Sequence, residues 1–408
     1  MKIKTCIRRC YFSLLLGAVL LPMASCSNDE EGRLDVDYSA PAQVSKVSAE
    51  AGPGEVYLSW AIPTNANFMY SKVTYKNSKG EEVYKLFSKE RADENGIMHE
   101  TISGFASTDP VDFNIYACSV KGASKEAVKY TATPGAPAFL AVAQSVDAES
   151  AWGGVNISYK NETAASVIIS VKYALKSDES KSGEVTFTAP GNSSNATFVA
   201  LTTGEYEFIN GETAVLSISA QDIEGNAADP IAKEVRTKKV EPIDRSNWSF
   251  PGYQDTNDAT IGYSSQEAGG EGASPNGRVI AMIDDNPNTF WHTAWKTSSA
   301  YPHFFIIDMG EENEVSNVSI RRRTNNNGTH TGQSFFTCSS SNASGSDPNE
   351  WGWTEQGWAS FNRDTNNTQV FGMSKLESSR YIKVYFAESD KGGDFVMISE
   401  FNAYKPAE

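Results

Sequence analysis

Apolar and polar residues alternate along many stretches of this 408-residue chain. The alternation has a period of two, which is typical of a β-strand with one buried face and differs from the spacing of an amphipathic helix. The clearest examples lie in residues 56–60, 155–159 and 167–173. The sequence therefore predicts an all-β protein.

Part of this pattern occurs twice. Val56 recurs 99 residues later as Val155, and the segment IYACSVKG around Ala117 aligns with ISAQDIEG around Ala220. Two similar β-sandwiches in tandem explain the repeat better than one large domain, since domains of about 100–200 residues are usual.

Prolines and polar runs mark the joints of the chain. Pro134 and Pro137 separate the first two units, and the stretch KKVEPIDRSN, from Lys238, follows the second. Each unit resembles a fibronectin type III module, over residues 37–134 and 138–238. The resemblance is at the level of strand pattern, because sandwich folds share architecture without sequence signatures.

The N-terminus has the charged, apolar and small-residue regions of a secretory signal. It resembles a bacterial lipoprotein signal, in which residues 1–25 are removed and Cys26 is lipidated. An ordinary secreted protein cut near Ala24 is the alternative. Residues 26–36 begin with the acidic run SNDEE after Cys26 and resemble a surface-display tether. The resemblance implies a lipid anchor in the outer membrane, with the protein facing the cell exterior.

The net charge excludes some partners. It is −16 for the whole chain and −20 without residues 1–25, because that segment holds four basic residues and no acidic ones. Nucleic acid and anionic lipid head groups are therefore poor partners, whereas neutral sugars remain possible. Cys118 and Cys338 lie in different expected domains, so we expect two unpaired core cysteines rather than a disulfide framework.

Five ordered motifs occupy the last third of the chain: AMIDDNPNTFWHTAW, YPHFFIIDMG, SIRRRTNNNG, RYIKVYF and ISEFNAY. Together they resemble the coagulation-factor type C or discoidin domain, especially the family-32 carbohydrate-binding modules, over about 250–406. This resemblance implies a jelly-roll β-sandwich of eight strands with ligand loops at one end. We expect this domain to span residues 245–408, after the two fibronectin-like sandwiches.

The resemblance implies a structural calcium ion in the first of these motifs. Its side-chain ligands would be Asp284, Thr289 and Glu400, with further oxygen atoms from Ala281, Asn286 and Asn288. Calcium prefers such hard oxygen ligands. Asp285 replaces the glycine of the family, which leaves open either a changed turn or a loop closed by hydrogen bonds without metal. Trp291 is expected in the core beneath this loop.

The galactose-binding members of that family combine an aromatic platform with a few fixed polar groups, as a neutral sugar requires. The matching residues here are His292, Trp295, Arg323, Asn326 and Asn327. A hydrogen-bonded structural role for His292 and core packing for Trp295 are the alternatives.

Other aromatic and histidine residues are less informative. His303 is expected to be structural, and His99 to be a plain strand or loop residue. His330, Trp351, Trp353 and Trp358 are expected either at a rim of the site or in strand packing.

The leading hypothesis is a non-catalytic cell-surface lipoprotein of a polysaccharide uptake system. Its third domain would capture a glycan of the galactose type for a neighbouring importer or hydrolase. The alternative is an adhesin or scaffold whose third domain binds a protein. A glycosidase is disfavoured, because such accessory folds serve binding.

Overall fold

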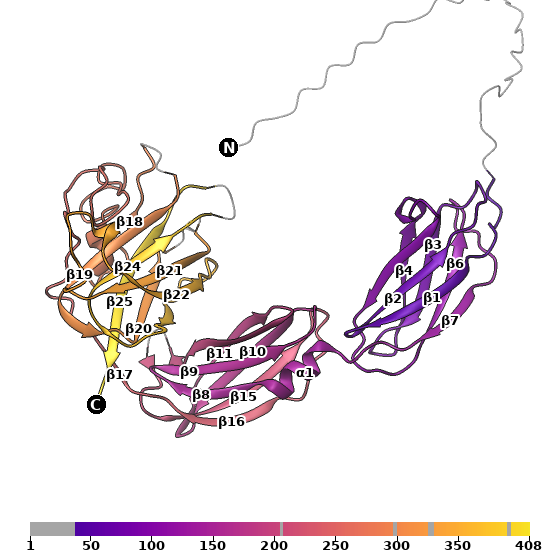
Figure 1. The fold of residues 1–408 in the computed structure, drawn as a ribbon, viewed down its shortest axis with the longest axis horizontal. Helices are drawn as coiled ribbons and strands as arrows, with labels where there is room; N and C mark the ends of the chain where they lie inside the picture. The colour runs from indigo at the N-terminus through magenta and orange to yellow at the C-terminus, as the bar shows by residue number, and fades with distance from the viewer. Residues whose placement is uncertain (1–36, 205–206, 297–299, 325–329, 390–392) are drawn as a thin grey trace, which may run out of the picture.

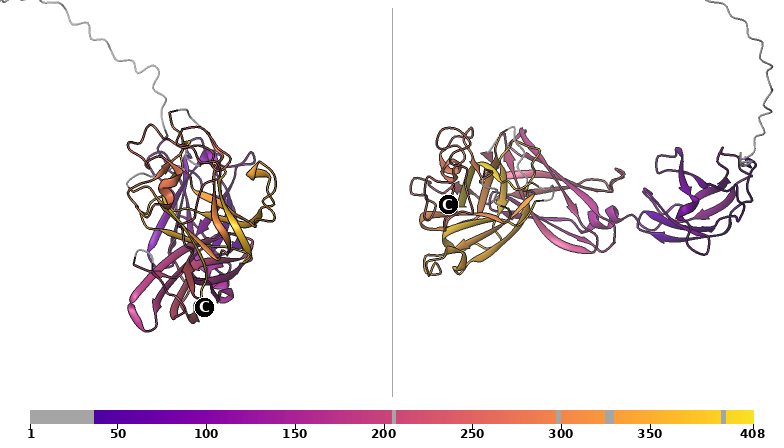
Figure 2. Two further views of the ribbon diagram at one scale, coloured as in Figure 1. Left: turned by 90° about the vertical axis from the view of Figure 1, so that its left-hand side faces the viewer. Right: turned by 90° about the horizontal axis from the view of Figure 1, so that it is seen from above.

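The computed structural model describes residues 37–204, 207–296, 300–324, 330–389 and 393–408. Its sheets are antiparallel throughout and form three β-sandwiches that follow one another along the chain (Figures 1 and 2). The prediction of an all-β protein is confirmed. Among the described residues, no helix is long and apolar enough to cross a membrane.

The first sandwich pairs a three-stranded sheet, in the order β1-β2-β5, with a four-stranded sheet, in the order β4-β3-β6-β7. Alternate residues of these strands point inward and make one core around Trp60, which is fully buried. The strands are β1 (Ser45–Gly52), β2 (Glu55–Ala61), β3 (Tyr70–Lys76), β4 (Glu82–Ser88), β5 (Ile97–Ser103), β6 (Val111–Cys118) and β7 (Val128–Ala132), with a 3₁₀ turn η1 (Lys89–Arg91).

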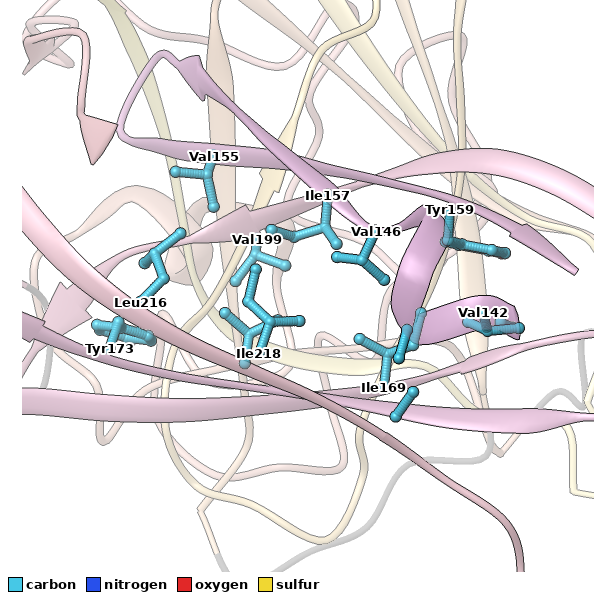
Figure 3. Close-up of a cluster of buried hydrophobic side chains, with 14 of the residues drawn as sticks. Val142, Val146, Val155, Ile157, Tyr159, Ile169, Tyr173, Val199, Leu216 and Ile218 are labelled. Carbon is cyan, nitrogen blue, oxygen red and sulfur yellow. The ribbon is translucent and has the colours of Figure 1, made fainter. Parts of the chain in front are cut away.

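The second sandwich repeats this plan, with sheets β8-β9-β12 and β11-β10-β15-β16 and a small hairpin β13-β14. Its core is a continuous layer of apolar side chains between the sheets (Figure 3). The strands are β8 (Asp147–Ala151), β9 (Gly154–Asn161), β10 (Val167–Leu175), β11 (Asp178–Ala189), β12 (Ser193–Ala200), β13 (Thr202–Thr203), β14 (Glu207–Phe208), β15 (Thr213–Gln221) and β16 (Ile231–Arg236).

The internal repeat of the sequence corresponds to equivalent strands. Val56 on β2 and Val155 on β9 are both central in a three-stranded sheet, and both are fully buried. Ala117 on β6 and Ala220 on β15 are likewise buried in equivalent strands of the four-stranded sheets. The repeat therefore records two copies of one core pattern.

One helix was not expected from the sequence. The segment AFLAVAQS forms α1 (Ala138–Ser145) directly after Pro137, and it buries Phe139 and Val142 against the second core. Alanine, leucine and glutamine favour a helix, and a proline just before the first turn is compatible with one. The short apolar run does not distinguish helix from strand by periodicity.

In the third sandwich, a five-stranded sheet packs against a four-stranded sheet. The five-stranded sheet has the order β17-β25-β20-β23, and β18 also pairs with β25. The four-stranded sheet has the order β19-β24-β21-β22. The strands and 3₁₀ turns of this sandwich are β17 (Val240–Pro242), η2 (Val279–Ile283), β18 (Trp291–His292), β19 (His303–Glu314), β20 (Asn317–Arg322), β21 (Gly332–Cys338), η3 (Pro348–Glu350), β22 (Thr354–Ser360), β23 (Gln369–Gly372), β24 (Ser378–Phe386) and β25 (Met397–Pro406).

The joint between the second and third sandwiches is itself a strand. The sequence places residues 240–242 in a linker, whereas the structure pairs them with the C-terminal strand β25 as β17. Asn317 Nδ2 also donates to the Trp152 carbonyl at 3.1 Å, and the rings of Phe208 and Tyr404 lie 5.0 Å apart. Gly372 packs so closely on Phe198 that a Cβ would approach the ring to 2.8 Å.

These contacts orient the third domain. Strand β20 begins at Asn317, beside the second sandwich, and ends at Arg322. At about 3.3 Å per residue, Arg323, directly after the strand, lies roughly 20 Å from the joint. The end of the domain that carries β18 thus faces away from the second sandwich (Figure 1).

Cys118 and Cys338 are both buried and free, as the sequence predicts. Burial raises the pKa of the Cys338 thiol to about 11, so this cysteine is a neutral core residue near pH 7.

Candidate functional site

The loop after η2 gathers oxygen atoms around Thr289. Thr289 Oγ1 lies 2.9 and 2.7 Å from the two carboxylate oxygens of Asp284 and 2.8 Å from the carbonyl oxygen of Asn286. Asp285 has φ +60°, the left-handed conformation that glycine adopts most easily. An aspartate therefore makes a left-handed turn here, where the resemblance led us to expect glycine.

Glu400 on β25 lies at the same loop. Burial raises the pKa of its carboxyl, and the hydrogen bond from Arg245 opposes that rise. Arg245 Nη1 donates to Glu400 Oε2 at 3.0 Å, and Arg245 Nη2 pairs with Asp285. The other oxygen, Glu400 Oε1, is buried without a hydrogen-bond partner in the described part of the chain.

The remaining expected metal ligands have different surroundings. Ala281 is fully buried in η2, and Asn286 donates its backbone N–H to Asp284 Oδ1 at 3.0 Å. Asn288 is exposed, and its side chain donates to Asn286 Oδ1 at 3.3 Å. In the described ranges, no group of three or more His, Cys, Asp or Glu side chains is placed to hold a metal. A cation at this loop would therefore use two carboxylates together with hydroxyl and carbonyl oxygens.

The second half of the motif presents Trp295 to solvent. Its side chain is 39% exposed, so the alternative of core packing is wrong. The indole Nε1 donates to Glu271 Oε1 at 2.9 Å, and the Trp295 backbone N–H donates to Glu267 Oε2 at 3.2 Å. Two carboxylates thus fix the position of an exposed aromatic ring.

Arg323, the residue directly after β20, reaches the same carboxylate. Its Nη1 donates to Glu271 Oε2 at 3.2 Å, and its guanidinium carbon lies 3.7 Å from the centre of the Phe290 ring. The Arg323 side chain is 26% exposed to solvent. Because an arginine has five donor hydrogens, several remain for a ligand.

His292 is the third residue that lies near Glu271. It is buried, with its ring 5.4 Å from that of Phe395. Its Nδ1 lies 2.6 Å from the Thr293 carbonyl, which can only accept, so Nδ1 carries the proton and the neutral ring leaves Nε2 as an acceptor. That Nε2 lies 3.9 Å from Glu271 Oε1. Burial lowers the pKa of His292, so the ring is neutral near pH 7.

The structure therefore brings His292, Trp295 and Arg323 together through Glu271, a residue that the sequence did not single out. Its only sequence signal is an acidic residue between the glycines of the stretch AGGEGAS. Asn326 and Asn327 lie outside the described residues.

Three of the other aromatic and histidine residues are buried in the third domain. Trp291 is fully buried, as expected, and its Nε1 donates to the Ser265 carbonyl at 2.9 Å. His303 is buried between Ser264 and the Asp394 carbonyl, which fits a structural role. His330 is buried between two phenylalanine rings, away from any rim.

A cleft of about 850 Å³ lies in the first sandwich, but its polar groups are largely paired. Thr131 Oγ1 donates to Asp112 at 2.6 Å, and Asn114 Nδ2 donates to Thr74 at 3.3 Å. Its aromatic side chain Tyr75 is buried and offers no open face. The candidate site is therefore the loop end of the third domain.

Comparison with known families agrees with this fold. Residues 260–401 match the model of the F5/8 type C domain. The protein is thus an all-β chain with an F5/8 type C β-sandwich at its C-terminal end.

Individual relatives match parts of the chain. A sialidase of Micromonospora viridifaciens is 42% identical over 57 residues, which are 14% of this chain and only 9% of that protein. The C-terminal domain of a chitobiase from Bacteroides fragilis is 22% identical, with a TM-score of 0.34, over 41% of this chain and 100% of that one.

Two further solved structures show similar values. The family 32 carbohydrate-binding module of NanJ from C. perfringens, in complex with galactose, is 23% identical, with a TM-score of 0.31, over 41% of this chain and 99% of that one. A SusE-like protein is 14% identical, with a TM-score of 0.33, over 66% of this chain and 99% of that one.

Proposed function

We propose that the third domain binds a galactose-type sugar at its loop end, without catalysing a reaction. The observation that carries this proposal is the convergence on Glu271 of an exposed indole, a partly exposed guanidinium and a buried histidine. Trp295 offers a face for the apolar side of a pyranose ring. Arg323 donates to ring hydroxyls, and Glu271 and His292 Nε2 accept from them.

We also propose that calcium holds the neighbouring loop. The unpaired, buried Glu400 Oε1 supports this, because a buried charged oxygen without a partner is costly. Asp284, Thr289 and Glu400 would hold the ion, with backbone carbonyls of the same loop. When bound, calcium supplies positive charge to this oxygen-rich loop. The chain from Thr289 to Trp295 then leads directly into the sugar site.

We further propose that the protein is a lipoprotein anchored through Cys26 at the outer surface of the outer membrane. Cys26 lies outside the described residues, so this proposal rests on the signal sequence. The two N-terminal sandwiches would then hold the sugar site away from the membrane. A neighbouring importer or hydrolase of a polysaccharide uptake system would take over the captured glycan.

Calorimetric titration of the chain from residue 37 onward with galactose, and with glucose as a control, tests the binding proposal. A shallow, wet site with one stacking ring should give a Kd in the micromolar to millimolar range, roughly −8 to −4 kcal/mol. Retention at a cell surface would then depend on many copies. If no sugar binds across a broad glycan array, the proposal fails and a protein-binding scaffold becomes the better explanation.

A further inference from the structure

The outer face of the sheet β19-β24-β21-β22 carries a row of aromatic side chains. The strand register places Trp358 opposite Ser334, Ser334 opposite Tyr385, and Tyr385 opposite Phe304. Directly paired residues share one face of a sheet. The neighbouring residues Phe335 and Val384 belong to the core, so this row points outward. The small serine leaves a depression between two large rings.

Trp358 is held in a fixed orientation although its side chain is 65% exposed. It lies directly over Gly332, where a Cβ would overlap the indole ring. One face of the Trp358 ring therefore packs on Gly332, and the other face is exposed to solvent. A large ring that is exposed and also positioned is a feature of binding surfaces.

Lys383 lies in the next row of the same face, opposite Phe336. Its ammonium group is 5.2 Å from the centre of the Phe304 ring, 5.7 Å from that of Trp353 and 5.9 Å from that of Tyr385. Lys383 Nζ donates a hydrogen bond to Asn349 Oδ1 at 3.0 Å. Burial among these rings lowers the pKa of Lys383, and the charge of Asp347 opposes that shift.

No carboxylate of the described residues lies within ion-pair distance of this ammonium group. Asp347, whose charge acts on this ammonium group, accepts hydrogen bonds from Asn349. Glu355 on β22 is separated from Lys383 on β24 by Phe336 on the strand between them. Two strand spacings correspond to about 10 Å. Lys383 is thus a half-buried cation that has aromatic neighbours and a free side toward solvent.

From this arrangement we propose that the Lys383 face, defined as Phe304, Ser334, Trp358, Lys383 and Tyr385, binds an acidic glycan. The carboxylate of a uronic acid unit would pair with Lys383, and pyranose rings would stack on Tyr385 and Trp358. A ligand with sparse carboxylates fits best, because the net charge of −16 repels densely charged polyanions such as nucleic acids. The proposal does not depend on the sugar site at Glu271.

The test is calorimetric titration of the chain from residue 37 onward with a glucose tetrasaccharide that carries glucuronic acid at one position. The same oligosaccharide with its carboxylate reduced to an alcohol serves as the neutral probe. We expect the acidic probe to bind more tightly, and its affinity to fall with added salt. Lys383→Gln should weaken its binding at least tenfold and should hardly affect the neutral probe. Lys383→Arg should retain affinity for the acidic probe to within about threefold, because the charge remains.

Two further variants separate this face from the loop end. Trp358→Ala should weaken both probes, because the stacking ring is lost, whereas Arg323→Ala should leave binding of the acidic probe unchanged. The proposal is overturned if the acidic probe does not bind, or if Lys383→Gln binds it as well as the parent. It is also overturned if Arg323→Ala, rather than Lys383→Gln, removes binding, which would assign the acidic sugar to the loop end.

Discussion

Arg245 Nη1 donates a hydrogen bond to Glu400 Oε2 across 3.0 Å and leaves the second oxygen of that carboxylate buried without a partner among the described residues. The two residues are 155 positions apart in the sequence. One half of the carboxylate is therefore neutralised by the protein itself. Burial raises the pKa of Glu400, and the charge of Asp284 adds to that rise.

Calcium should stabilise the third domain through this unpaired oxygen. At one hundred times its Kd, a ligand that binds only the folded state adds about 2.7 kcal/mol to the free energy of unfolding. Asp284→Asn and Glu400→Gln should each remove most of that gain. Differential scanning calorimetry with calcium and with a chelator measures it. Glu311→Gln, at an exposed acid on β19, is the matched control and should keep the full shift. Identical melting of metal-free protein with and without calcium would refute the assignment.

Asp285→Gly should leave the fold intact and change stability by less than about 1 kcal/mol. Glycine adopts the left-handed backbone more easily, and the ion pair to Arg245 that is lost lies at an exposed carboxylate. Asp285→Val should destabilise the domain by about 1–2 kcal/mol, because a β-branched residue disfavours φ near +60°. Urea unfolding of the two variants gives the comparison. Equal stability of both would mean that the turn is not left-handed in solution.

Trp295→Ala and Arg323→Ala should each weaken galactose binding at least about tenfold, which corresponds to 1.4 kcal/mol. The first removes the stacking ring, and the second removes a donor to ring hydroxyls. Trp295→Phe keeps a ring but loses the bond to Glu271, so it should have an intermediate affinity. His99→Ala, on the first sandwich, is the control and should bind as the parent does. If Trp295→Ala and Arg323→Ala fold and bind normally, the site lies elsewhere.

The free energy of unfolding of the third domain should decrease as the pH is lowered, because of His330. Burial lowers its pKa to about 3, whereas the unfolded side chain titrates near 6.5. The unfolded state therefore takes up the proton first as pH falls. The contribution of His330 is complete above pH 6.5 and is lost progressively between 6.5 and about 3. At pH 5 the loss should be about 2 kcal/mol.

His330→Leu should remove this part of the pH dependence. Neither ring nitrogen has a hydrogen-bond partner in the described part of the chain, and both ring neighbours, Phe361 and Phe386, are apolar. The variant should therefore be at least as stable as the parent at pH 7. His292 and His303 also have lowered pKa values and remain in both proteins, so the difference between the two isolates His330. If the free energies of unfolding of the parent and of His330→Leu decrease equally between pH 7 and pH 5, the prediction is contradicted.

Cys26→Ala should release the protein from the membrane fraction, because no lipid can then be attached at that position. Fatty-acid labelling and detergent partition measure the change, and Cys118→Ala serves as the control at a buried cysteine. A Cys26→Ala variant that still partitions with detergent would place the anchor elsewhere.

Strand patterning predicted what depends on local alternation. Val56 and Val155 fall on equivalent buried strands because a period of two places every second side chain on one face. Trp291 was expected beneath its loop and is fully buried there. Helix α1 was missed because its run of eight residues is too short and too uniformly apolar to show a helical period.

The candidate site depends on contacts that no local pattern contains. Glu271 meets Trp295 across 24 positions and Arg323 across 52. Only the closure of the sandwich brings these loops to one end, so a single acidic residue in a glycine-rich stretch gave no sign of its role. The family resemblance supplied the candidates, and the geometry of the fold supplied the residue that links them.

The strand β17 also determines how the molecule carries a load. A force that pulls the sugar site away from the second sandwich acts along β25, whose first residues pair with β18 and whose last residues pair with β17. The hydrogen bonds between β17 and β25 lie across that direction, since they are perpendicular to antiparallel strands. Tension therefore shears these bonds together instead of opening them one after another, which makes this joint resistant to mechanical separation of the second and third sandwiches.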